Sequence, residues 1–265
     1  MARSGIQFQK GLSLPEFQRF YGTEEQCEAA LEKTRWPDGF RCPRCKGHEH
    51  GLVHGRRLKR YQCRTCGHQA TLTAGTILQS TKLPLTTWFL AFYLIGQAKT
   101  GMSSLELSRH LGVKYDTAWL LHNKILRAMS EREEAYLLRG KIQMDDSYLG
   151  GEHPGGKAGR GSENKIPIIA AVSLNEAGHP IHARITAVSG FSSEAIADWA
   201  KRHLSPGSQV LSDGLACFRA VTTANCHHKA VVTGGKHPKD LPLFRWINTL
   251  LGNLNWARAS EADLD

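Results

Sequence analysis

The chain has 265 residues, of which 41% are hydrophobic and 22% are charged, as is usual for a globular protein with a buried core. It contains no run of eighteen apolar residues and no apolar signal segment at its start, so we expect no membrane-spanning helix and a cytoplasmic location. The net charge of +10 is uneven: residues 1–140 have 21 Lys and Arg against 12 Asp and Glu, and residues 141–265 have 13 against 12. A basic front half favours a polyanionic partner, although a basic surface that only aids solubility would carry the same charge.

The chain begins with a segment, residues 1–38, that is predicted to be helical. Within it, residues 13–34 are predicted to form one or two short helices. Apolar residues from Leu14 to Phe20 recur on one face, and Thr23 precedes acidic residues as a helix N-cap does. This segment leads into a region rich in cysteine.

The most specific motif of the sequence is a set of four cysteines within residues 39–82. Two Cys-x2-Cys pairs are separated by seventeen residues, and Gly67 gives the second pair room to turn. Four thiolates form a complete tetrahedral set for one structural Zn²⁺ ion, as in zinc ribbons. An iron–sulfur cluster or a redox role is the alternative, but a redox motif needs one such pair and not two. The predicted zinc ligands are Cys42, Cys45, Cys63 and Cys66.

Basic residues surround these cysteines. Residues 41–66 contain eight Lys or Arg and one acid, which favours contact with DNA phosphates. A solvated ribbon face that only supports the next domain is the alternative. The candidate DNA contacts here are Arg56, Arg57, Lys59 and Arg60.

A helix-turn-helix is predicted within residues 83–138, after a helix near residues 86–99 that has apolar residues nearly all round and is expected to be buried. Ser103 and Glu106 have the spacing of a capping box, Gly112 interrupts the helical pattern, and a longer helix follows. The second helix of such a motif enters the major groove, although a plain helical hairpin has the same layout. Lys114, Tyr115 and Thr117 are the candidate DNA contacts, and Ala118, Leu121 and Ile125 are expected to face the core.

From residue 139 onward the pattern changes to strands. Three extended segments follow one another in residues 141–188, then an amphipathic helix from Ser192 or Ser193, two short strands, and a helical tail. This order predicts an α/β domain over residues 139–265.

Two acids occur where these strands should be buried. Asp145 falls within the first strand, and Asp213 ends a short strand just before Gly214. An acid there is costly unless it is exposed, paired or bound to metal, and two acids on neighbouring strands would suit Mg²⁺ or Mn²⁺. Asp146 should point to the opposite face of the strand and is the weaker candidate.

Taken in order, these motifs resemble a known family. The zinc ribbon, the helix-turn-helix, MDDSYLGG, LSDG and WINTLLGN are similar to bacterial insertion-sequence transposases of the DDE superfamily, in the subgroup with an N-terminal zinc ribbon. The resemblance implies an RNase H-like catalytic domain, a mixed sheet flanked by helices. It also implies that Asp145 and Asp213 are catalytic acids. The third catalytic position matches Asn253, with Asn248 as the competing residue.

The end of the chain departs from that subgroup. A Lys is usual two residues after the third position, followed by a Gly-Thr-Tyr-His stretch, whereas this chain has Asn255 and ends in WARASEADLD. We therefore expect a catalytic domain truncated at its C-terminus.

The expected function is that of a DNA transposase. Its partners would be double-stranded DNA, namely the terminal repeats of the element and the target, and a second copy of the chain when active. Its cofactors would be structural Zn²⁺ and catalytic Mg²⁺ or Mn²⁺, and it would act at the bacterial nucleoid. The alternative is a regulator or an inactive remnant that binds DNA without catalysis.

Overall fold

The structure is a computed structural model of the chain, and it describes residues 11–53, 59–98, 101–150, 165–232, 234 and 241–262, the last with side chains up to 254. The chain divides into two compact units, Met1–Ser130 and Glu131–Asp265. Each unit has its own core and is described by itself. The finer division into four segments stays a prediction.

The first unit starts with two short helices, α1 (Leu14–Tyr21) and α2 (Glu24–Arg35). The hydroxyls of Ser13 and Thr23 each accept a hydrogen bond from the backbone N–H three residues on, and their own N–H groups donate to the side chains of Glu16 and Gln26, so both helices begin with a capping box. The predicted helices at residues 13–34 are confirmed.

A three-stranded antiparallel sheet follows, formed by β1 (His50–Val53), β2 (Arg60–Cys63) and β3 (Gln69–Thr71). Its small core contains Phe40, Tyr61 and Leu72, each at most 5% exposed. Arg35 at the end of α2 donates a hydrogen bond to the Leu72 carbonyl at 2.7 Å, which ties this sheet to the helix before it.

The rest of the unit is helical: α3 (Leu85–Gln97), α4 (Ser104–Leu111) and α5 (Tyr115–Glu134). Ser103 caps α4 by accepting from the Glu106 N–H at 3.1 Å, and Gly112 ends it at φ = 63°, a left-handed conformation that glycine adopts without strain. The apolar composition of α3 predicted a buried helix, but only Leu85, Trp88 and Ala91 are buried, and most of its other residues are half-buried. Neither α3 nor any other helix in the described ranges is long and apolar enough to span a membrane.

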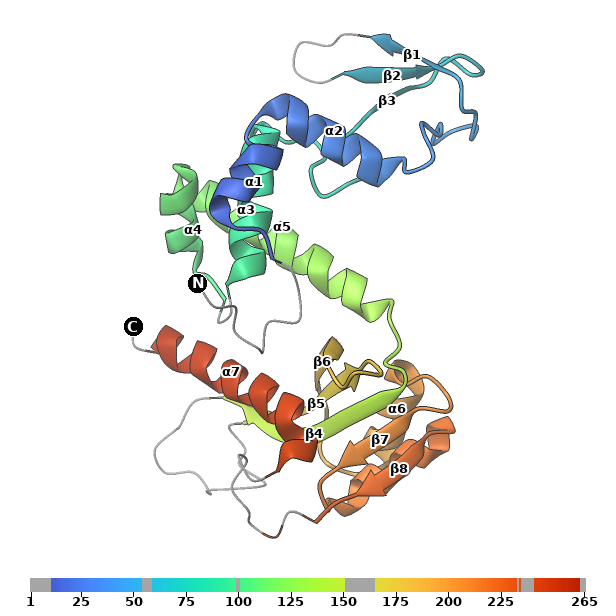
Figure 1. The fold of residues 1–265 in the computed structure, drawn as a ribbon, viewed down its shortest axis with the longest axis vertical. Helices are drawn as coiled ribbons and strands as arrows, with labels where there is room; N and C mark the ends of the chain where they lie inside the picture. The colour runs from blue at the N-terminus through green and yellow to red at the C-terminus, as the bar shows by residue number, and fades with distance from the viewer. Residues whose placement is uncertain are drawn as a thin grey trace. The chain divides into compact units, whose positions relative to one another are not determined.

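The second unit is built on a five-stranded mixed sheet (Figure 1). The strands are β4 (Lys141–Leu149), β5 (Ile166–Leu174), β6 (Pro180–Ala187), β7 (Gln209–Ser212) and β8 (His227–Ala230), in the spatial order β6-β5-β4-β7-β8. Pairing is antiparallel along β4, β5 and β6 and parallel along β4, β7 and β8. Strand β4 is therefore central, with β5 on one side and β7 on the other.

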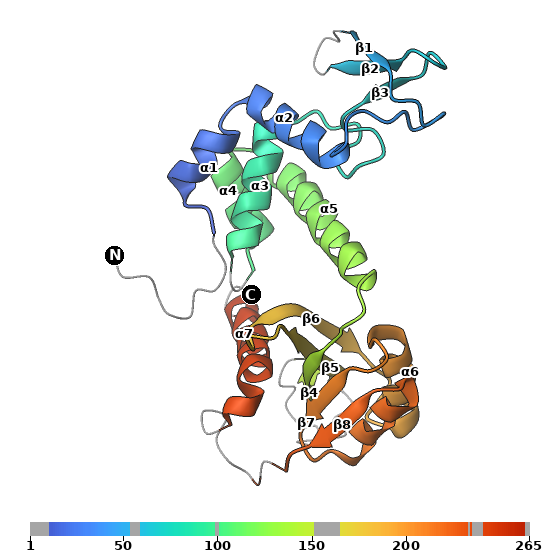
Figure 2. The same ribbon diagram turned by 45° about the vertical axis from the view of Figure 1, so that its right-hand side comes forward.

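Helices cover both faces of this sheet (Figure 2). One face packs on α6 (Ser193–His203) and the 3-10 helix η1 (Ala216–Ala224), and the other on the 3-10 turn η3 (Pro242–Phe244) and α7 (Arg245–Ala262). Strand β5 is apolar almost throughout because Ile169 and Ala171 face the first layer while Ala170 and Val172 face the second. The predicted α/β fold, a mixed sheet flanked by helices and preceded by a four-cysteine ribbon, is confirmed; the sequence reasoning did not predict η1.

Candidate metal centres and nucleic-acid interface

The four cysteines lie on two similar turns. In the first, the Lys46 N–H donates to the Cys42 carbonyl and Lys46 has φ = 64°; in the second, the Gly67 N–H donates to the Cys63 carbonyl and Gly67 has φ = 70°. The left-handed residue in each turn brings the two thiols of a pair to the same side. Gly67 thus allows the second pair to turn, as expected, whereas Lys46 adopts the same left-handed conformation in the first turn without being a glycine.

The geometry of the four thiols fits zinc. All four Sγ atoms lie within 4.8 Å of one another, with 3.7 Å between Cys42 and Cys66 and 3.5 Å between Cys45 and Cys63. A tetrahedron with Zn–S bonds of about 2.3 Å has sulfur–sulfur edges of about 3.8 Å. Burial opposes ionisation of Cys63, yet the Cys66 N–H and the Cys45 thiol lower its pKa to about 6. A closed set of four sulfur ligands suits a structural ion with no open position for chemistry.

A second cluster of possible ligands is acidic and lies in the middle of β4 and just past the end of β7. The parallel pairing of these strands ends with Met144 opposite Ser212. Asp145, which is still paired with Ala170 of β5, therefore lies beside Asp213, the first residue after β7. The carboxylate oxygens of Asp145, Asp146 and Asp213 lie within 4.8 Å of one another, and the three residues are half-buried. Oxygen ligands at this spacing suit a hard divalent cation such as Mg²⁺ or Mn²⁺.

The expectation that Asp146 points away from this site was wrong. Strand alternation separates the Cβ atoms of neighbouring residues, but it does not fix where their carboxylates end. The Asp146 N–H donates to Asp145 Oδ1 at 3.0 Å, so the Asp145 carboxylate bends along its own strand toward Asp146. Asp213 Oδ1 accepts from the Leu215 N–H at 3.1 Å, which holds it at the start of the turn before η1.

Helix α7 carries the two asparagines considered for the third position. Both Asn248 and Asn253 are half-buried, and the Asn248 side-chain nitrogen is buried without a hydrogen-bond partner among the described residues. Phe244 and Ile247 of η3 and α7 pack on the sheet, which places Asn248 beside the sheet-facing stripe, whereas Asn253 lies more than a turn further along. The choice between them stays open.

Two protein-family models match the chain. Residues 22–69 match a transposase zinc-ribbon domain, and residues 137–260 match an ISXO2-like transposase domain. Together they cover more than half of the 265 residues, and they contain the cysteine cluster and the acidic cluster, respectively. The chain belongs to the ISXO2-like DDE transposases with an N-terminal zinc ribbon.

A relative of the chain is an uncharacterized protein in the transposable element ISH50 of Halobacterium salinarum, 27% identical over 129 residues. The match covers 48% of this chain and 42% of the relative, so the chain spans less than half of that relative's length. Because that relative is archaeal, the bacterial source expected from the sequence stays a prediction. A crystal structure of a pre-cleavage Mos1 transpososome overlaps 61% of this chain and 64% of its own at 10% identity, but its TM-score of 0.23 is too low to carry an argument.

Of the four basic ribbon residues expected to bind DNA, Lys59 and Arg60 lie within the described residues, whereas Arg56 and Arg57 lie outside them. Lys59 forms an ion pair with Glu28 of α2 at 3.1 Å, and Arg60 is exposed on β2. A phosphate contact by Lys59 would therefore compete with Glu28, whereas Arg60 is accessible.

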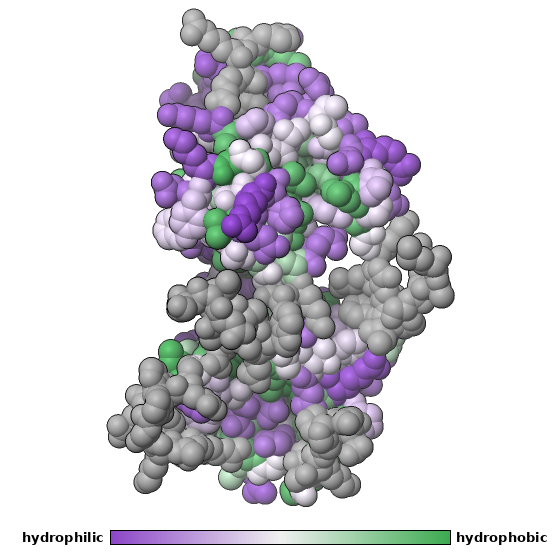
Figure 3. All heavy atoms as spheres, turned by 90° about the vertical axis from the view of Figure 1, so that its left-hand side faces the viewer, coloured by the Kyte–Doolittle hydropathy of each residue, from purple (hydrophilic) through white to green (hydrophobic). Residues whose placement is uncertain are grey.

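In the second helix of the helix-turn-helix candidate, the residues expected in the core are buried and the candidate DNA contacts are exposed or half-buried. Ala118, Leu121 and Ile125 are at most 4% exposed and face the core as expected, while Lys114 and Tyr115 are exposed and Thr117 is half-buried. On the face shown in Figure 3, hydrophilic side chains of this unit are interspersed with apolar ones. DNA binding by these residues stays a prediction.

Proposed function

We propose that the chain is an active transposase that binds the ends of its insertion element and catalyses metal-dependent DNA cleavage and strand transfer. The observation that supports this most directly is the meeting of Asp145, in the middle of β4, with Asp213, just past the end of the adjacent parallel strand β7, and with Asp146 beside them. The acidic site is part of the matched ISXO2-like transposase domain.

The donor set fits the proposed chemistry. Three carboxylates within 4.8 Å repel one another unless a cation neutralises them. A pair of divalent cations at such a site stabilises the attacking and leaving oxygens of a phosphodiester. Asp145 and Asp213 would hold these ions, with Asn253 or Asn248 as a neutral further ligand from α7.

The proposed reaction has two displacements at phosphorus. In the first, water attacks a phosphodiester at the element end, and the bond from phosphorus to the 3′ oxygen breaks, which frees a 3′-hydroxyl. In the second, that hydroxyl attacks a target phosphodiester and displaces another 3′ oxygen. Neither displacement requires a covalent bond between protein and DNA.

Recognition of DNA would belong to the first unit. The exposed Arg60 of the ribbon and the exposed Lys114 and Tyr115 at the start of α5 would contact the terminal repeats. Because two element ends must be joined, we propose that the active form contains at least two copies of the chain.

The test compares Asp145→Ala and Asp213→Ala with the control Asp198→Ala, which removes an exposed acid on α6. Nicking of a labelled element end is measured in Mg²⁺ and in Mn²⁺, and DNA binding is measured by gel shift. We expect both site variants to lose nicking and to keep DNA binding, while Asp198→Ala keeps both. If the wild-type chain binds element ends but never nicks them, it is a DNA-binding regulator or remnant and the proposal is wrong.

A further inference from the structure

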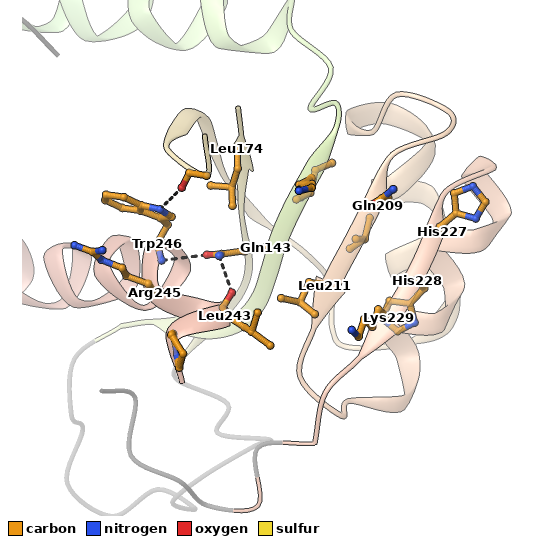
Figure 4. Close-up of a pocket in the computed structure, with 15 residues that line it drawn as sticks. Gln143, Leu174, Gln209, Leu211, His227, His228, Lys229, Leu243, Arg245 and Trp246 are labelled. Atoms are coloured by element: carbon orange, nitrogen blue, oxygen red, sulfur yellow. Dashed lines mark hydrogen bonds between the residues drawn. The ribbon is translucent and has the colours of Figure 1, made fainter. Parts of the chain in front are cut away.

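Gln143 is a polar side chain on the central strand, and it is only 6% exposed. Its amide makes three hydrogen bonds to residues a hundred or more positions away. Oε1 accepts from the Trp246 N–H at 3.1 Å and from the Ile247 N–H at 3.0 Å, and Nε2 donates to the Leu243 carbonyl at 2.6 Å. Figure 4 shows the bonds to Trp246 and Leu243. Only the amide oxygen can accept from two N–H groups and only the amide nitrogen can donate to a carbonyl, so this network fixes the amide orientation.

These bonds join β4 to the beginning of α7. The first N–H groups of a helix lack partners within the helix, and Gln143 satisfies two of them from another element. A further hydrogen bond at the same end of α7 does not involve Gln143: Trp246 Nε1 donates to the Gly178 carbonyl, in the connection between β5 and β6, at 2.7 Å. The start of α7 is thus held at two points of the sheet.

The same strand also carries the acidic site. Gln143 and Asp145 are two residues apart on β4, about 7 Å along the strand, and their side chains leave the same face. Asn248 and Asn253 follow Trp246 on α7 by about 3 Å and about 10 Å along the helix axis. The Gln143 bonds therefore fix the distance along β4 and α7 between Asp145 and either asparagine.

We propose that Gln143 is a positioning residue of the acidic site, which sets the position of α7 and so places its asparagine ligand opposite Asp145 and Asp213. This inference rests on the proposed function, because it assumes that these acids hold a divalent cation. Oxygen ligands of Mg²⁺ must lie at about 2.0–2.1 Å, so a small shift of α7 removes the asparagine from the ion. A residue that orients a ligand in this way typically changes metal affinity or activity by about 10–100-fold when it is replaced.

The test uses the full chain with its ribbon loaded with zinc. Gln143→Met removes all three bonds at similar volume, and Gln143→Glu keeps the two acceptor bonds to α7 and loses the donor bond to Leu243. Gln209→Met is the matched control, because Gln209 is an exposed glutamine on β7 that lines the same cavity of about 890 Å³ as Gln143. Mn²⁺ affinity is measured by titration calorimetry with Asp145→Ala as the reference without the site, and nicking is measured as a function of Mg²⁺ concentration.

We expect Gln143→Met to weaken Mn²⁺ binding by about 10–100-fold and to raise the Mg²⁺ concentration needed for half-maximal nicking, with gel-shift affinity for DNA unchanged. Gln143→Glu should lie closer to the wild type than to Gln143→Met, and Gln209→Met should equal the wild type. A folded Gln143→Met chain that binds Mn²⁺ as the wild type does would overturn the inference, as would an equal loss in Gln209→Met or a wild-type chain that binds no Mn²⁺.

If circular dichroism shows that Gln143→Met does not fold, Mn²⁺ affinity is measured on Trp246→Phe instead. This variant loses the bond to the Gly178 carbonyl and replaces the indole by the smaller phenyl ring, so it loosens the same end of α7. We expect weaker Mn²⁺ binding, and an unchanged affinity would overturn the inference. A wild-type chain that binds Mn²⁺ through Asp145 but never nicks DNA would contradict the proposed function alone, because the Mn²⁺ affinities of the variants still decide the role of Gln143.

Discussion

Replacing Cys63 by alanine should unfold the zinc ribbon and leave the second unit folded. Cys63 is 1% exposed and is one of four sulfur ligands on the two turns of the ribbon. The three largest apolar side chains of the ribbon core, Phe40, Tyr61 and Leu72, contribute about 5–9 kcal/mol together by burial. A structural zinc ion contributes about 10–16 kcal/mol in zinc-finger peptides, so the ion is the largest single contribution to the stability of this small sheet.

The assay combines zinc content, measured by mass spectrometry of the metal, with amide hydrogen exchange. In Cys63→Ala we expect zinc to fall below one equivalent and the amides of β2 and β3 to lose protection, while β4 and β5 keep theirs. Cys217→Ala is the control, since Cys217 is also buried but lies in the second unit, outside the cluster. If Cys63→Ala retains one zinc per chain and protected amides in β2, the assignment of the four cysteines as one closed zinc site is wrong.

Two further predictions concern the second unit. Trp199 of α6 is fully buried against the sheet. In urea unfolding experiments, Trp199→Ala should lower the free energy of unfolding of this unit by about 3–5 kcal/mol and leave the zinc content unchanged. A loss below about 1 kcal/mol would contradict this packing. Burial, together with the nearby charges of Arg184 and Arg202, lowers the pKa of His203 to about 4. Between about pH 6.5 and about pH 4, His203 is therefore protonated in the unfolded chain but neutral in the folded chain, so the free energy of unfolding of the unit should decrease as the pH falls through this range. His203→Gln should make the free energy of unfolding, measured by urea titration at several pH values, depend less on pH.

Local signals in the sequence located both candidate metal sites. The four cysteines were recognisable because spacing within each pair places two thiols on one turn, which needs no knowledge of distant contacts. The helices at residues 13–34 and 193–203 were predictable for a similar reason, since their caps and apolar stripes lie within a few residues of one another. One acid within the first strand of the α/β domain and one at the end of a later strand indicated Asp145 and Asp213.

Predictions about side-chain direction and exposure were less successful. Alternation along a strand assigned Asp146 to the far face, but a hydrogen bond between its N–H and Asp145 brings the two carboxylates together. Lys59 was a candidate DNA contact in a basic stretch, and nothing in the sequence indicated its ion pair with Glu28, 31 residues earlier. The composition of α3 predicted full burial, which depends on how many neighbours a helix has and not on its own residues.

The sequence by itself determined which residues can bind metal and the order of the elements that carry them. Ligand type, pair spacing, caps and hydrophobic period act over a few residues, so they can be read along the chain. Only the tertiary structure decided which side chains meet: Asp145 with Asp213 through parallel pairing of β4 and β7, and Gln143 with the start of α7 through three hydrogen bonds. These contacts join residues about 70 and 100 positions apart, and packing of the sheet and its helices brings them together, which no local pattern specifies.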